Sequence, residues 1–223
     1  MADSLVWLEP ESLHYHTGDV AHIKALQGKM MRREAGADFS GWVGYAVDPA
    51  GDVLDADIVP GGADYHRVAF FTGGEGLYSL VLENGFPDNA GQSGEAGSGS
   101  GSAGGNRPVQ RARLSVPVGH DIQASSGNLC KEGLDVYCEE FKQYSPGDII
   151  TIRVMYNGRP LSGASLAATH HLHEGDGYLW QGETGSEGAV SLKLTDKGHW
   201  LFVCRHTGAG IVHTSTFVVP GVR

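Results

Sequence analysis

Positions 146–156 read PGDIITIRVMY, a turn that leads directly into a strand pattern. A glycine and an aspartate behind a proline favour a tight turn. From Ile150 to Tyr156 bulky side chains recur at every second residue, while Thr151 and Arg153 fall between them. Because side chains alternate across an extended chain, this pattern predicts a β-strand with one apolar face.

The same unit occurs earlier in the chain, where positions 15–20 read YHTGDV and lead into another alternating run. Hairpin-type turns follow in both units, at 48–51 and 185–188. Each unit then reaches a glycine with an aromatic-led strand behind it, GLYSLV at 76–81 and GHWLFV at 198–203. One unit of strands and turns is therefore repeated.

Strands separated by Gly, Asp and Pro turns are typical of β-sandwiches. Between the units, positions 95–105 read EAGSGSGSAGG, which has nothing to bury. We predict an all-β chain of two tandem immunoglobulin-like β-sandwich domains, residues 1–87 and 111–223, joined by a flexible Gly/Ser-rich segment at 88–110. Almost no helix is expected. The apolar run WLFVC at 200–204 predicts a central strand that is covered on both faces.

Charge and motifs exclude several classes of function. The formal net charge is −10 and no long Lys/Arg run is present, so nucleic acid is an improbable partner. The sequence holds no run of about 18 apolar residues, which predicts that no segment spans a membrane. No GxSxG, HExxH, Walker A or GxGxxG motif occurs, so we predict that the protein is not an enzyme.

Met1-Ala2-Asp3 runs directly into a strand-like segment. We interpret this as a mature, exported sequence whose signal peptide is removed, and the alternative is a cytoplasmic protein. In an oxidising compartment, Cys130 and Cys138 are predicted to form a disulfide that closes a small loop. Cys204 falls in an apolar run and is predicted to be a free, buried thiol.

Motifs spread over about two-thirds of the chain resemble those of the DUF4198 family, exported bacterial proteins of which some are associated with nickel and cobalt uptake. The matching segments are LVWLEP at 5–10, PGD at 146–148, YNGRPLSGA at 156–164, TGSEG at 184–188 and GHWL at 198–201. The resemblance implies two immunoglobulin-like sandwiches behind a cleaved signal peptide.

Two departures from the family pattern concern histidine. Family members often carry a His at the mature N-terminus, where this chain has Ala2-Asp3-Ser4, and a Gly-His-Pro-Phe-type motif where it reads QGKMM at 27–31. If those family histidines bind metal, this chain needs a substitute elsewhere.

The chain has 11 histidines, and three of them fall in THHLHE at 169–174. On an extended strand His171 and His173 point the same way and His170 the opposite way, so the first two can share one ion. Glu174 can add an oxygen ligand. His206, at the end of the strand that begins near Trp200 and next to a cross-strand His213, is a further candidate ligand.

Two plainer explanations stand beside this one: an exposed loop tolerates histidine without any role, or binds metal only adventitiously. His14 and His16, two residues apart, form a weaker candidate pair, which a hairpin could bring to His22. His120 is interpreted as an isolated surface residue, like His66 and His199.

These observations predict a periplasmic or secreted metal-binding accessory protein. Its cofactor would be a divalent transition metal ion, nickel or cobalt first and zinc or copper next, since imidazole suits all four. A membrane transporter component would be its partner. The alternative is a non-catalytic structural or adhesion module that binds protein or glycan.

Overall fold

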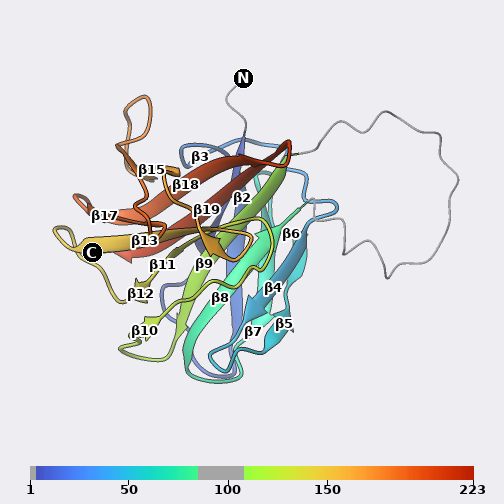
Figure 1. Ribbon diagram of the computed structural model, residues 1–223. Coiled ribbons are helices and arrows are strands. Elements are labelled where there is room, and N and C mark those ends of the chain that lie inside the picture. The colour runs from blue at the N-terminus through green and yellow to red at the C-terminus, as the bar shows by residue number, and fades with distance from the viewer. Residues whose placement is uncertain (1–3, 85–107) are drawn as a thin grey trace, which may run out of the picture.

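The computed structural model describes residues 4–84 and 108–223, which contain strands and loops but no helix (Figure 1). The all-β prediction is therefore confirmed. Within these ranges no helix long and apolar enough to cross a membrane is found. The predicted flexible segment falls largely on residues 88–107, which lie outside the described residues.

The largest element is an eight-stranded sheet in the order β16-β15-β18-β19-β9-β8-β4-β5. Its strands come from both sequence repeats: β4 (Val43–Val47), β5 (Val53–Asp55), β8 (Gly76–Glu83), β9 (Val109–Val118), β15 (Ser165–His170), β16 (Trp180–Glu183), β18 (Gly198–Gly208) and β19 (Ile211–Val222). Neighbours run antiparallel, except that β19 and β9 are parallel. Strand β9 therefore joins the two halves of the sheet.

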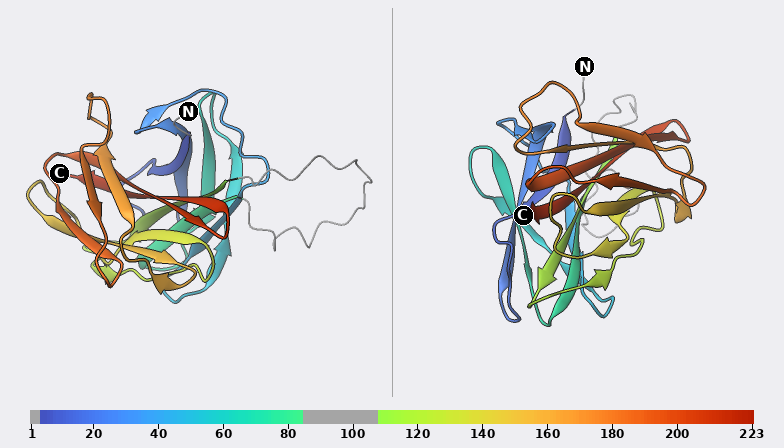
Figure 2. Two further views of the ribbon diagram at one scale, coloured as in Figure 1. Left: turned by 45° about the horizontal axis from the view of Figure 1, so that its top comes forward. Right: turned by 90° about the vertical axis from the view of Figure 1, so that its left-hand side faces the viewer.

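Two smaller sheets and a short ribbon complete the fold (Figure 2). The first smaller sheet contains β1 (Leu5–Pro10), β2 (Val20–Lys29), β3 (Arg32–Arg33), β6 (Asp57–Pro60) and β7 (Tyr65–Phe71). The second contains β11 (Leu134–Cys138), β13 (Ile149–Tyr156), β14 (Arg159–Pro160) and β17 (Ala189–Lys193). The ribbon pairs β10 (Ala124–Ser125) with β12 (Glu140–Phe141).

Strand β18 shows how the layers are stacked. Leu201 and Val203 are buried in the core with the first smaller sheet, whereas Trp200, Phe202 and Cys204 are buried in the core with the second. Because neighbouring side chains point to opposite faces, the two smaller sheets cover opposite faces of this strand. The prediction of a central strand covered on both sides is confirmed.

The two cores share strands rather than dividing at one point of the sequence. The core of the first smaller sheet also takes Val218 from β19, so that it combines residues as far apart in the chain as Leu5 and Val218. The proposed domain boundaries at 87 and 111 stay a prediction. The described residues form an all-β fold of packed sheets.

Strand β9 presents an apolar and a charged face. Leu114 and its alternating neighbours enter the first core, while Arg111 and Arg113 point the other way, toward β11. The Arg113 guanidinium donates to Asp135 Oδ2 at 2.8 Å, and both side chains are 0% exposed. Arg111 pairs in the same way with Glu83 at 2.8 Å. The Arg113–Asp135 pair, together with the bond from Arg111 to the Leu134 carbonyl, thus holds the second smaller sheet against β9.

Replacing Asp135 with Asn is expected to lower the free energy of unfolding by about 3–5 kcal/mol, because the substitution leaves the Arg113 charge buried and uncompensated. Urea denaturation monitored by tryptophan fluorescence measures the change. The exposed Arg67–Glu11 pair supplies the control, where Glu11→Gln should cost less than about 1 kcal/mol. Equal effects from the two variants would contradict this role for the buried pair.

The predicted Cys130–Cys138 disulfide is wrong, because all three cysteines are free and buried. Cys138 ends β11 facing the second core, where its sulfur lies 3.4 Å from the Tyr144 hydroxyl. The Cys130 sulfur instead contacts the Tyr45 hydroxyl at 3.8 Å, on another element. The free, buried state predicted for Cys204 is confirmed.

Burial should make all three thiols unreactive in the folded protein. It raises the pKa of Cys130 and of Cys204 to about 12 and also raises the pKa of Cys138. Since the thiolate is the reactive form, we expect no alkylation of native protein by iodoacetamide at pH 8 and three alkylations after unfolding without reductant. Intact-mass spectrometry counts them, and a native-state adduct or a missing pair after unfolding would contradict this assignment.

Candidate metal centre

The loop between β1 and β2 places two histidines on one side of a buried tyrosine. Tyr15 is buried, and its hydroxyl donates to the His22 carbonyl at 2.8 Å and accepts from the Ser12 amide at 3.2 Å. Because side chains alternate along an extended segment, anchoring Tyr15 inward turns His14 and His16 outward together. Both are exposed.

A second contact brings the third histidine to this loop. Tyr15 forms a parallel bridge with Val118, the last residue of β9, and its carbonyl accepts from the Gly119 amide at 2.8 Å. Gly119 has φ +99°, a conformation that favours glycine, and there the chain turns away from the strand. The next residue, His120, therefore lies beside His14.

The three imidazoles of His14, His16 and His120 form the histidine triad of this structure. One ligand nitrogen from each lies within 4.8 Å of the others, and all three side chains are exposed. The His14 ring centre lies 4.5 Å from that of His16 and 4.5 Å from that of His120. No second group of three His, Cys, Asp or Glu ligand atoms converges in this way among residues 4–84 and 108–223.

The triad fits a transition-metal ion after a small adjustment. Zinc binds imidazole nitrogen at about 2.0–2.1 Å, so two nitrogens on one ion lie at most about 4.2 Å apart. The observed spread of 4.8 Å must shrink, which exposed side chains can achieve by rotating. Three ligands leave at least one coordination position open, as in metal sites that accept a further ligand.

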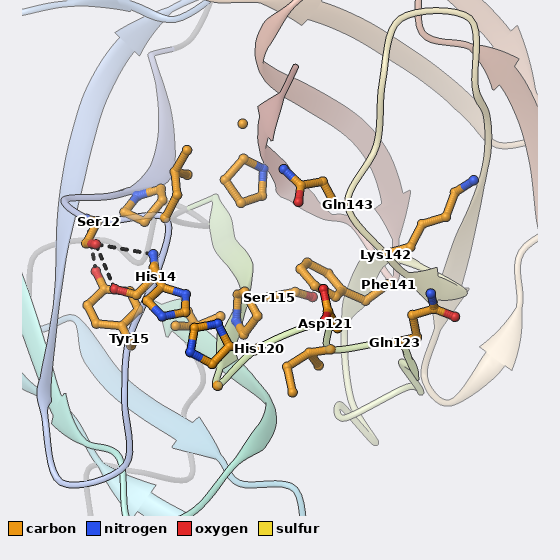
Figure 3. Close-up of a pocket in the computed structure, with 18 of the residues that line it drawn as sticks. Ser12, His14, Tyr15, Ser115, His120, Asp121, Gln123, Phe141, Lys142 and Gln143 are labelled. Atoms are coloured by element: carbon orange, nitrogen blue, oxygen red, sulfur yellow. Dashed lines mark hydrogen bonds between the residues drawn. The ribbon is translucent and has the colours of Figure 1, made fainter.

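A cavity of about 390 Å³ adjoins the triad, and His14 and His120 line it. Figure 3 shows these two rings on one side, with Phe141, Lys142 and Gln143 across from them. Ser115 of β9 lines the same cavity. The open coordination positions of an ion in the triad therefore have space beside them for another molecule.

Comparison with known proteins assigns the chain to a family. The family model described as "Domain of unknown function (DUF4198)" matches residues 5–208. The chain belongs to the DUF4198 family. All three triad histidines lie inside the matched range. A search of the curated proteins found no match to this DUF4198 chain.

Solved structures align over almost the whole DUF4198 chain with low similarity. The D0–D1 domain of intimin is 12% identical over 99% of this chain and 98% of its own, with a TM-score of 0.29. The human OSCAR ligand-binding domain is 12% identical over 96% of this chain and 97% of its own, with a TM-score of 0.26. A tetra-tandem repeat of a large adhesion protein is 11% identical over 99% of this chain and 50% of its own, with a TM-score of 0.31.

The predicted His-rich loop of this DUF4198 chain does not continue the strand. Strand β15 ends at His170, and the His173 amide donates to the His170 carbonyl at 3.0 Å, which closes a turn. The expectation that His171 and His173 share a face was therefore wrong, because alternation ends where the strand ends. His170 is buried, with its ring 5.2 Å from that of Trp200.

The other residues of this loop point to separate partners. His171 Nδ1 accepts from the His199 amide at 2.8 Å, and the Glu174 carbonyl accepts from Arg32 at 2.8 Å. The His170 and His173 rings are 6.0 Å apart. The role of these loop residues as metal ligands stays a prediction.

His206 and His213 are cross-strand neighbours on β18 and β19, as the sequence predicted. Both rings pack against Tyr156, at 4.5 Å and 5.3 Å between ring centres. A metal role for His206 also stays a prediction.

Sequence reasoning missed His120, which was interpreted as isolated. The only signal available was the alternation in His14-Tyr15-His16, which indicates an anchored aromatic between two outward imidazoles. Nothing near His120 in the sequence tells which loop it meets.

Two buried histidines should make folding stability depend on pH. Burial is the main cause that lowers the pKa of His170 and of His213, while Asp196 opposes the shift at His170 and His206 adds to it at His213. The unfolded chain then binds protons at a higher pH than the folded chain. The contribution of these histidines to the free energy of unfolding is fully present above about pH 6.5, the ordinary pKa of histidine. The free energy of unfolding should fall as the pH drops toward 5.

Urea midpoints measured between pH 7.5 and 5 should show this decline. His213→Gln should make the decline shallower, because it removes one of the contributing groups, which also include His199, whose pKa burial lowers as well. A midpoint that stays constant over this range would contradict the assignment.

Proposed function

We propose that this DUF4198 protein is an exported metal-binding protein that captures a divalent transition metal ion through His14, His16 and His120. The observation that supports it is the convergence of three exposed imidazoles from two loops. Imidazole is the commonest protein ligand for such ions, and it is neutral and ready to bind near pH 7. The net charge of −10 favours the approach of a cation.

Service to a nickel or cobalt uptake system is the finer part of the proposal. It rests on membership of the family, some members of which are associated with such systems. Ligand chemistry alone does not choose the metal, since affinity for imidazole sites rises along the series to copper. The ion is treated as cargo because three exposed ligands allow both entry and release.

Isothermal titration of the protein with Ni²⁺ at pH 7 tests the proposal. The double variant His14→Ala/His16→Ala should weaken binding by about 100-fold or more, because two of the three protein ligands are lost. Binding should also weaken as the pH is lowered, since a protonated imidazole does not ligate.

The matched control is His171→Ala/His173→Ala, which also removes two histidines that are two residues apart in the sequence. It should change affinity less than about threefold if the triad holds the ion. The reverse pattern would locate the ion in the 170–174 loop, and equal small losses would indicate adventitious binding. No binding by the unaltered protein would favour the adhesion alternative.

A further inference from the structure

We propose that the cavity beside the histidine triad binds a small organic anion with several carboxylates, which completes the coordination of the captured ion. The protein would then take up a metal chelate instead of a bare ion. This inference rests on the proposed function and adds the class of ligand that accompanies the metal.

A buried hydroxyl without a partner points to a ligand in this cavity. Ser115 is 1% exposed, lines the cavity, and its Oγ makes no hydrogen bond. A buried hydroxyl that lacks a partner costs free energy, and most such groups are paired in folded proteins. A carboxylate oxygen in the cavity would accept from it.

The charge of a metal ion held in the triad favours an anion as well. Neutral imidazoles bring no negative charge, so a divalent ion held by His14, His16 and His120 keeps its two positive charges. A carboxylate is a suitable ligand for such an ion and neutralises it. An anion that coordinates the ion and also occupies the cavity gains binding free energy from both contacts.

The wall across from the triad carries donors. Lys142 lines the cavity, and its ammonium also lies 3.5 Å from Asp148. Arg223 lines it too. Asp121 is the one acidic side chain among the described lining residues, so cationic side chains outnumber acidic ones.

Size and shape agree with a small organic molecule. A volume of about 390 Å³ falls within the roughly 300–1,000 Å³ of small-molecule sites. Ile122 and Phe141 provide apolar surface for a carbon skeleton between the polar groups. A single metal ion at the triad leaves this surface uncovered.

Equilibrium dialysis with radiolabelled citrate, with and without Ni²⁺, tests the inference. One citrate per protein should be retained when Ni²⁺ is present and almost none without it. Lys142→Gln and Ser115→Ala should each weaken citrate retention about 5- to 20-fold, while the affinity for Ni²⁺ alone changes less than twofold. Lys24→Gln, a lysine outside the cavity, is the matched control and should change neither quantity.

Folding of the Ser115→Ala variant is checked by its melting temperature, which should not fall, because the hydroxyl it removes has no partner. If citrate removes Ni²⁺ from the protein and is not retained, the inference is overturned while the proposed function stands. Equal citrate retention with and without Ni²⁺ also overturns it. Failure of Ni²⁺ to bind in the absence of citrate would instead refute the proposed function.

Discussion

The whole arrangement depends on three strands, β9, β18 and β19, that are buried on both faces. Each meets different neighbours on its two faces, so its register is fixed, because a slip of one residue would exchange the two faces. On β18 both faces are apolar, with Trp200 on one side and Leu201 on the other. On β9 the second face is charged, and Arg113 is tolerated there only because Asp135, the Gly127 carbonyl and the Ser126 hydroxyl accept from it.

The polar face of β9 also leads to the candidate site. Arg111 and Arg113 are paired beneath the second smaller sheet, whereas Ser115, two residues further on, meets the cavity. Just beyond the strand, the bridge from Val118 to Tyr15 fixes the two loops that carry the triad. Rigid strands thus hold exposed ligands in place, which is the usual division between scaffold and binding loop.

Much of the fold could be predicted from local patterns. Turns, alternating strands and the doubly covered strand near Trp200 all leave a signature in adjacent residues. The sheet shared between the halves does not, because the parallel pairing of β19 with β9 joins segments far apart in the sequence. The same reason hid His120, and the turn after His170 defeated an argument that holds only along an extended strand. The wrong disulfide had a similar cause, since loop spacing does not tell that Cys138 faces a core.

The sharing of strands sets an order on how the chain can fold. Leu201, Val203 and Val218 complete the core that begins with Leu5, so the earliest segments wait for nearly the last ones. As the polypeptide leaves the ribosome, its first half has no finished interior and exposes apolar side chains. Such a chain exposes this surface until the later strands have been made, a state that chaperones can hold.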